Sequence, residues 1–300
     1  MNRGLAYRAK EEIDNAIADY SKAIDINPRY ANALLNRGIA YQSRGDHDRA
    51  ISDYTRAIEV NPRYAAAYID RGTAYRAKGE KDRAIVDFTK AIEIAPRVEA
   101  YKNRGNAFQA EGDLDRAIVD FDKAIEMNPN DADSYNNRGA AYKAKGENDR
   151  AITDFGKALE IDPRLAKTYY NRAAVYRAKS EIDRAIVDYS EAIEIDPLYG
   201  NAYLSRGSAF EAKGDHNRAI VDFTKAIEIT PQNADAFYDR GLAHRAKGEI
   251  DKAIADYTHA IELNPRHAAA YNSRSKAFEA AGEFDRAIAD HKKAVEIGVR

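Results

Sequence analysis

The chain has 300 residues, of which 47 are basic and 49 acidic, so its formal net charge is -2 at pH 7. Such a balance provides no overall positive field, and we expect no nucleic-acid partner. The absence of cysteine excludes disulfides and thiol catalysis. No apolar run approaches membrane-spanning length and the first residues lack the pattern of a signal peptide, so we expect no membrane partner and, by default, a cytoplasmic location.

A 34-residue pattern repeats along the chain and is clearest from Ala132 to Leu165, which we use as the reference repeat. Its informative positions are 4, 8, 11, 15, 20, 24, 27 and 32, occupied there by Tyr135, Gly139, Tyr142, Gly146, Ala151, Phe155, Ala158 and Pro163. The eight prolines all occupy position 32, at intervals of 34 residues except for one of 33. A fixed period of this length predicts stacked copies of one unit. The predicted repeats are 1–30, 31–64, 65–98, 99–131, 132–165, 166–199, 200–233, 234–267 and 268–300.

Each repeat contains two amphipathic helix patterns. Positions 4, 8 and 11 share one face of a first helix, and positions 20, 24 and 27 share one face of a second. In the reference repeat we expect Gly146 to form the turn between the helices, Asp149 to cap the second helix and Pro163 to stop it. Folded as an antiparallel hairpin, the two helices place each large ring opposite a small residue. The sequence therefore predicts an all-α fold of nine hairpins.

This spacing resembles that of the tetratricopeptide repeat. The resemblance implies a right-handed α–α superhelix, a solenoid that we expect to form a single domain over residues 1–300. It also implies that positions 2, 5, 6, 9 and 12 of the first helices line a concave groove, and that the protein is a scaffold for protein–protein interaction. No catalytic motif is found and the six histidines are scattered, so we expect no enzyme activity, no cofactor and no metal site.

Taken in chain order, the repeats depart from the pattern at few places. The first begins at position 5, and Leu34 replaces the ring at position 4 of the second. Repeat 99–131 has lost one residue from the junction before it, which we expect to alter the local twist. In repeat 166–199 Ala173 and Ser180 replace both glycines. Ser180 is expected to cost about 1 kcal/mol if its backbone is left-handed. His291 replaces the ring at position 24 of the last repeat.

Positions 7 and 23 depart from the family pattern in every repeat. Position 7, usually an apolar leucine in the family, is arginine nine times, at Arg3, Arg37, Arg71, Arg104, Arg138, Arg172, Arg206, Arg240 and Arg274. Position 23 is aspartate nine times, at Asp19, Asp53, Asp87, Asp120, Asp154, Asp188, Asp222, Asp256 and Asp290. The two positions face each other across the hairpin, so we expect structural ion pairs such as Arg138–Asp154 and Arg172–Asp188. The alternative partner of Asp154 is Arg150, four residues earlier on its own helix.

The groove positions vary most between copies, as expected of a face presented to a partner. In the middle of the chain they are rich in amides and basic groups, and we expect the peptide-binding residues there to be Lys102, Asn103, Asn106, Asn136, Asn137, Lys143, Lys167, Tyr170, Asn171 and Arg177. Position 6 is asparagine in five copies, and a row of carboxamides can hold an extended peptide by its backbone. This row resembles the asparagine ladder of O-linked N-acetylglucosamine transferase. The alternative is a solvated polar face inherited by duplication.

A more specific resemblance concerns the two-carboxylate clamp of co-chaperones that bind acidic C-terminal tails. Four of its five positions match here, namely Lys102, Asn106, Asn137 and Lys167, and Asn171 stands where the clamp has arginine. We therefore expect a protein or peptide partner, specifically an extended peptide with an acidic free C-terminus, bound weakly unless Arg177 replaces the missing arginine. Two alternatives remain open: a structural array that self-associates head to tail through its ends, and a designed or duplicated array with no evolved partner.

Overall fold

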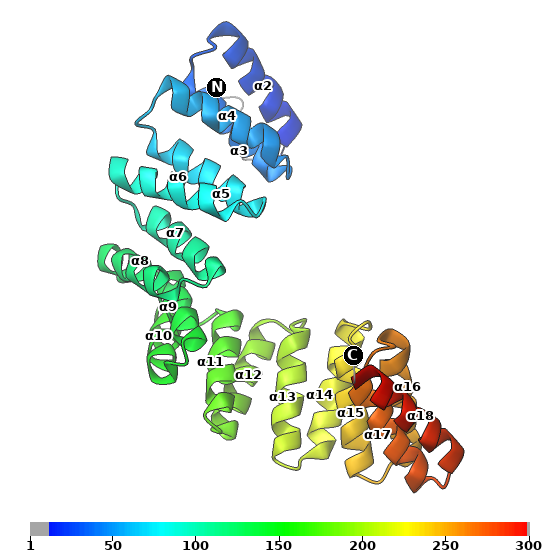
Figure 1. Cartoon of the computed structure of the whole chain (residues 1–300). Helices are drawn as coiled ribbons and strands as arrows, with labels where there is room; N and C mark the ends of the chain where they lie inside the picture. Colours follow the sequence, from blue (N-terminus) through cyan, green and yellow to red (C-terminus); the bar gives the residue numbers. More distant parts are fainter. Residues whose placement is uncertain (1–11, 299–300) are drawn as a thin grey trace. The chain divides into compact units, whose positions relative to one another are not determined.

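The computed structural model describes residues 12–298, and over this range it contains seventeen α-helices and no strand (Figure 1). The helices are α2 (Ile13–Ile26), α3 (Ala31–Ser43), α4 (His47–Val60), α5 (Ala65–Ala77), α6 (Lys81–Ile94), α7 (Val98–Glu111), α8 (Leu114–Met127), α9 (Ala132–Ala144), α10 (Asn148–Ile161), α11 (Ala166–Ala178), α12 (Ile182–Ile195), α13 (Gly200–Ala212), α14 (His216–Ile229), α15 (Ala234–Ala246), α16 (Ile250–Leu263), α17 (Ala268–Ala280) and α18 (Phe284–Gly298). Odd numbers from α3 onward are first helices of repeats and even numbers are second helices. The first helix expected for repeat 1–30 lies outside the described residues. The all-α prediction is confirmed.

The turn inside each hairpin depends on a left-handed residue at position 15. Seven glycines there have φ between 75° and 85°, including Gly146 with φ 76°, a conformation that glycine adopts without steric cost. Ser180 takes the same conformation with φ 62° and is the only non-glycine residue with positive φ among residues 12–298. The strain expected for Ser180 therefore falls on the hairpin of α11 and α12.

Three second helices are capped by an aspartate one residue before they begin, at position 16. Asp46, Asp113 and Asp215 each accept a hydrogen bond there from the backbone amide three residues later. The prediction that Asp149 caps its helix was wrong, because α10 begins at Asn148 and Asp149 lies inside the first turn. A carboxylate in the first turn still stabilises the helix through its dipole.

Glycine at position 8 allows the two helices of a hairpin to approach closely. A Cβ atom on Gly139 would lie 2.9 Å from Cε1 of Phe155, a contact that packed atoms do not tolerate. Phe155 is completely buried as a result. Repeat 166–199 has Ala173 and Tyr189 at the same two positions, and both are buried in one cluster. These contacts confirm the prediction that the ring at position 24 lies opposite a small residue.

The missing residue of repeat 99–131 is absorbed just before its first helix. Arg97, which precedes α7, is extended with φ -140° and ψ 144°, whereas the equivalent Tyr64 before α5 has φ -89° and ψ 79°. Helix α7 begins at Val98, one residue before the predicted start of the repeat, and is one residue longer than α5. The deletion thus straightens the entry to the helix and leaves the hairpin intact. It also brings α5 and α7 into more extensive contact than other neighbouring first helices.

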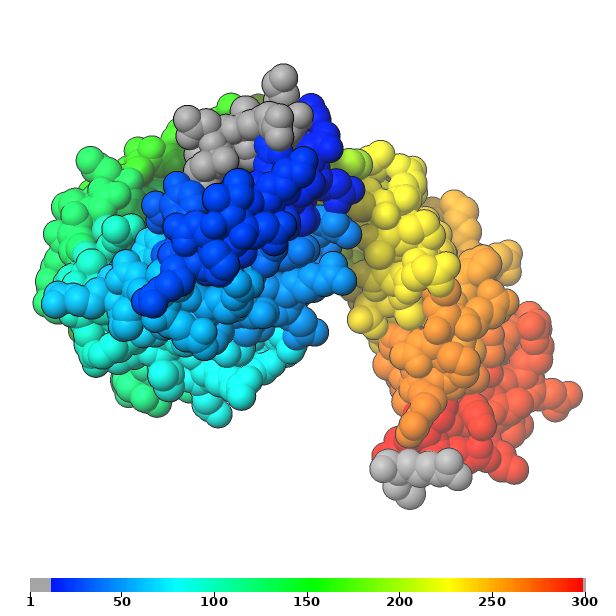
Figure 2. Space-filling view, turned by 90° about the horizontal axis from the view of Figure 1, so that it is seen from above, coloured from blue at the N-terminus to red at the C-terminus, as the bar shows by residue number. Residues whose placement is uncertain are grey.

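The helices fall into two compact units, and the boundary in the sequence lies between Ile161 and Asp162. The first unit holds α2 to α10 and the second α11 to α18. Within each unit the hairpins stack in sequence order, so that the colours of Figure 2 follow one another as contiguous bands. Within a unit, a second helix packs against the first helix of the repeat that follows it, as α4 does against α5 and α14 against α15.

Successive first helices also approach one another within each unit. This holds for α3 with α5, α5 with α7 and α7 with α9 in the first unit, and for α13 with α15 and α15 with α17 in the second. Over the described residues no second helix makes a comparable contact with the next second helix of its unit. Because the first helices lie closer together than the second helices, they form the inner side of each stack. Positions 2, 5, 6, 9 and 12 of the first helices face away from the packed interior of the hairpins. We call the surface that they form the inner face.

Candidate functional site

The aspartate at position 23 lies in the interior of each hairpin and is bound by the arginine at position 7. In the reference repeat Nε and Nη2 of Arg138 donate to Oδ2 and Oδ1 of Asp154, both at 2.7 Å. Asp154 is only 4% exposed, and this two-bond fork is the strongest geometry available to such a pair. Arg172 and Asp188 make the same contact, at 2.7 and 2.9 Å. Six further pairs repeat it: Arg37–Asp53, Arg71–Asp87, Arg104–Asp120, Arg206–Asp222, Arg240–Asp256 and Arg274–Asp290. Arg3 lies outside the described residues.

The surroundings of Arg138 keep it charged. The hydrogen bond to Asp154 raises the pKa of Arg138 although burial opposes the charge. Its guanidinium carbon also lies 5.6 Å from the ring centroid of Tyr135 and 5.9 Å from that of Tyr142, within the range of cation–π attraction. Arg150, the alternative partner of Asp154, donates instead to Glu147 at 2.8 Å. Because the pair is buried and its arginine lies beside two aromatic rings, it is placed to stabilise the hairpin rather than to bind a ligand.

A third hydrogen bond of the same arginine joins neighbouring repeats, and the sequence analysis missed it. Nη1 of Arg240 donates to the hydroxyl of Thr224, at position 25 of the preceding repeat, at 3.1 Å. In Arg138 this nitrogen donates to Asp122 at 2.6 Å. The other acceptors at position 25 are Ser21, Thr55, Thr89, Ser190 and Thr258. The recurrence of a hydroxyl or carboxylate at position 25 was the signal that could have revealed it.

In the first unit the candidate lysine Lys102 is already held by two carboxylates. Its Nζ lies 3.2 Å from Oδ1 of Asp131 and 3.2 Å from Oδ2 of Asp133. Burial disfavours the charge, but the hydrogen bonds and charges of both aspartates outweigh it and raise the pKa of Lys102. Asp131 also caps α9 through the amide of Ser134. A ligand carboxylate at Lys102 must therefore compete with the chain's own carboxylates.

The amides of the first unit lie on the inner face, half-buried, and some bind within their own helix. Asn136 Nδ2 donates to Oδ1 of Asn137 at 3.2 Å. In α3 Asn36, at position 6, donates to the backbone oxygen of Asn32 at 2.7 Å. Asn103, Asn106 and Lys143 are half-buried beside them on α7 and α9. The amide row is therefore present, and part of its donor capacity is used locally.

In the second unit the candidate residues differ in accessibility. Lys167, in the first turn of α11, and Arg177, in its last turn, are exposed, and Asn171 is half-buried between them. Tyr170 packs into an aromatic cluster, with its ring centroid 5.6 Å from that of Tyr189 and 5.1 Å from that of Tyr199. Tyr170 therefore contributes to the packing of the repeats.

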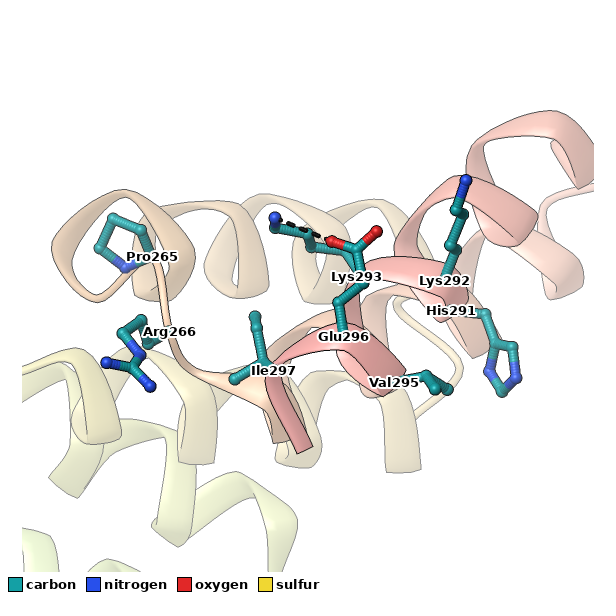
Figure 3. Close-up of a pocket in the computed structure, with 8 residues that line it drawn as sticks. All are labelled: Pro265, Arg266, His291, Lys292, Lys293, Val295, Glu296 and Ile297. Carbon is teal, nitrogen blue, oxygen red and sulfur yellow. Dashed lines mark hydrogen bonds and ion pairs between the residues drawn. The ribbon is translucent and has the colours of Figure 1, made fainter. Parts of the chain in front are cut away.

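A hollow lies away from the inner face, against the last helix. It has a volume of about 760 Å³ and is lined by Pro265, Arg266, His291, Lys292, Lys293, Val295, Glu296 and Ile297 (Figure 3). Lys293 donates to Glu296 across its rim at 3.1 Å. The side chains of α18 are unusually exposed, with Phe284 at 64% and Ile288 at 68%.

Residues 12–298 contain no group of three or more histidine, aspartate or glutamate side chains placed to hold a metal ion. Over the same range no helix is both long and apolar enough to cross a membrane.

Comparison with known proteins identifies the family. The profile described as tetratricopeptide repeat matches residues 31–64, 65–97, 132–165, 166–199 and 234–267, which is more than half of the chain. A second profile, described as TPR repeat, matches residues 4–45, 105–146 and 207–244. The chain belongs to the tetratricopeptide-repeat family. The five segments that match the first profile follow the predicted repeat boundaries closely. No curated protein matches this tetratricopeptide-repeat chain.

Solved structures of other tetratricopeptide-repeat proteins resemble the chain. A crystal structure of MamA protein shares 28% identity with a TM-score of 0.52, over 57% of this chain and 93% of its own. YrrB, described as a TPR protein with an unusual peptide-binding site, shares 26% identity with a TM-score of 0.51, over 61% of this chain and 95% of its own. A tetratricopeptide-repeat protein from Parabacteroides merdae, at 19% identity and a TM-score of 0.60 over 83% and 98% of the two chains, supports the fold alone.

Proposed function

We propose that this tetratricopeptide-repeat protein binds an extended peptide along its inner face. Tetratricopeptide repeats serve generally as non-catalytic scaffolds for protein–protein interaction, and the proposal locates that role on one surface. The observation that carries it is the contrast between positions. The packing residues hardly change from repeat to repeat, whereas the inner face changes character in every repeat. Partly exposed amides and cations on such a face can bind both the backbone and the charged groups of a peptide.

The finer proposal is that the peptide ends in an acidic, free C-terminus. It rests on Lys102, Asn106 and Asn137 of the first unit, and Lys167 and Asn171 provide groups of the same kind separately in the second unit. Lys167 is exposed, and no carboxylate in its own helical turn competes for its ammonium group. The ammonium group of Lys102, in contrast, is already bound by Asp131 and Asp133. Because a ligand must displace the contacts of Lys102, we expect weak binding that falls steeply with added salt.

The test compares labelled peptides that end in Glu-Glu with either a free carboxylate or an amide, using fluorescence anisotropy. We expect the free carboxylate to bind about tenfold more tightly, since two charge-assisted hydrogen bonds are at stake. Lys102→Ala should remove most of that difference for a tail bound at the first unit, and Lys167→Ala for a tail bound at the second. Lys157→Ala is the control, because Lys157 pairs with Glu160 on a second helix. Equal affinity for the two peptides, or no loss in either variant, would contradict the acidic-tail proposal.

A second candidate function is self-association through the last repeat. Ile288 and Val295 of α18 are 68% and 51% exposed. Their equivalents in the preceding repeat, Ile254 and Ile261, pack against the hairpin that follows. A second copy of the chain could cover this face as a further repeat does. Sedimentation velocity over a range of concentrations decides the matter: a monomer at every concentration would exclude this candidate and leave peptide binding untouched.

A further inference from the structure

Within a unit, each repeat packs on the one before it through positions 3, 7 and 10 of its first helix. In α17 these positions are Ala270, Arg274 and Ala277. Both alanines are completely buried, in clusters with residues of the preceding second helix, α16. Between them, Nη1 of Arg274 donates to the hydroxyl of Thr258 on α16 at 2.9 Å. Two small residues that permit close approach and one polar contact thus hold a first helix on its neighbour.

The acceptor of this polar contact, position 25, changes its chemistry in the last repeat. At every junction between described repeats of a unit, the arginine at position 7 donates to a hydroxyl or a carboxylate at position 25. Position 25 of the last repeat is Lys292, the only basic residue at this position in any repeat. An ammonium group cannot accept a hydrogen bond, and it repels a guanidinium. Helix α18 is therefore unsuited to pack against a first helix of the kind found in this chain.

The side of α18 next to Lys292 is apolar and exposed. Phe284, Ile288 and Val295 are each more than half exposed, whereas the residues at their positions in α16 pack in clusters that include the alanines of α17. His291 is exposed as well. We call the surface formed by Phe284, Ile288, His291, Lys292 and Val295 the end face. An exposed apolar surface beside a charged residue is typical of a site that binds a partner.

Positive charge surrounds the end face. The hollow beside it is lined by Arg266, His291, Lys292 and Lys293, with one acidic residue, Glu296 (Figure 3). Lys293 is paired with Glu296 at 3.1 Å. Lys292 is exposed and has no ion-pair partner within residues 12–298. An unpaired ammonium group at the edge of an apolar surface favours a partner that supplies a carboxylate at that point.

We propose that the end face binds an amphipathic helix of a partner protein in which two small residues, seven positions apart, flank an acidic residue four positions after the first. The small residues take the places that positions 3 and 10 occupy at the junctions within a unit. The acidic residue takes the place of the arginine at position 7 and pairs with Lys292. This inference goes beyond peptide binding at the inner face. It also disfavours a second copy of the chain as the occupant, because every repeat of that copy carries arginine at position 7.

The experiment measures the binding of two labelled helical peptides to the full chain by fluorescence anisotropy. The peptides share the two small residues and differ only in the residue between them, which is glutamate in one and arginine in the other. We expect the glutamate peptide to bind about tenfold more tightly, the effect of one charge-assisted hydrogen bond. Lys292→Thr should reverse this preference, because threonine restores the acceptor present at other junctions. Lys293→Thr is the matched control and should keep the preference, because Lys293 is already paired with Glu296.

A second pair of variants tests where the peptides bind. Ile288→Asp places a charge in the apolar part of the end face and should weaken both peptides by about tenfold or more. Val221→Asp is its control, because Val221 is equally exposed on α14. Equal affinity for the two peptides, or a preference that Lys292→Thr leaves unchanged, overturns the proposal. Self-association in sedimentation velocity that Ile288→Asp abolishes would show that a second copy covers the end face, and it would overturn the proposal as well.

Discussion

At the scale of the residue, the most consequential feature is the buried carboxylate at position 23. An aspartate that is 4% exposed, such as Asp154, is stable only because Arg138 binds both of its oxygens. The third contact of the arginine, to Asp122 of the preceding repeat, extends the same network across a repeat boundary. One side chain thus fixes the register within its own hairpin and the position of that hairpin on the preceding one.

This network predicts a strongly non-additive double-mutant cycle. Arg138→Leu leaves Asp154 buried without a partner and should lower the free energy of unfolding by about 3 to 5 kcal/mol, as should Asp154→Tyr for the arginine. The double variant carries the residues usual in the family and should lose much less, because apolar replacement of both partners is often nearly neutral. Urea unfolding gives the three values, and Arg150→Leu serves as the exposed control. Additive losses would show that the pair is not energetically coupled.

At the scale of the element, each hairpin depends on one left-handed residue between its helices. Gly214 and its equivalents adopt this conformation freely, and a Cβ atom there would meet no neighbour within 4 Å. A side chain at this position therefore costs free energy through backbone strain alone. Ser180, with φ 62°, is where the chain carries that strain.

Ser180→Gly should raise the free energy of unfolding by about 1 kcal/mol, because it removes the left-handed penalty of a side chain. The greater freedom of glycine in the unfolded chain offsets part of the gain. Gly214→Ser, the reverse change at the same position one repeat later, should lower stability by a similar amount. Thermal and urea unfolding of both variants measure the effect. A loss of stability in Ser180→Gly would mean that the serine hydroxyl does more for the turn than the strain costs.

At the scale of the whole molecule, each repeat within a unit contacts its neighbours and little else. The core is accordingly a series of small clusters, such as the one around Phe223 with Phe210, Ala219 and Ala243. In such an array stability is a sum of local terms, and damage in one repeat spreads only to the adjacent ones.

Phe223→Ala should therefore reduce protection from hydrogen exchange mainly in α13, α14 and α15. The expected loss is about 3 to 5 kcal/mol, the cost of removing a fully buried phenylalanine, and α3 to α6 should keep their protection. Phe88→Ala removes the equivalent ring in the first unit. It should reduce protection mainly in the helices around Phe88 and leave that of α13 to α15 unchanged. Uniform loss of protection over all helices would instead indicate a single cooperative unit.

The sequence determined what depends on short separations along the chain. Helix periodicity, the glycine turn and the small residue opposite each ring are local, so the all-α hairpins and the packing of Gly139 on Phe155 could be read from the spacing. Helix ends depend on more than spacing. The spacing places the lost residue at the junction before repeat 99–131, but the extra residue of α7 depends on how the extended Arg97 enters the helix.

The tertiary structure decided what depends on how one repeat lies on the next. The hydrogen bond from Arg240 to Thr224 and the two aspartates around Lys102 both involve residues of neighbouring repeats or helices. The 34-residue period predicts that the repeats stack, but it does not give the rotation of one repeat relative to the next. That rotation decides which side chains meet, because hydrogen bonds require an approach within about 3.2 Å and a narrow range of angles.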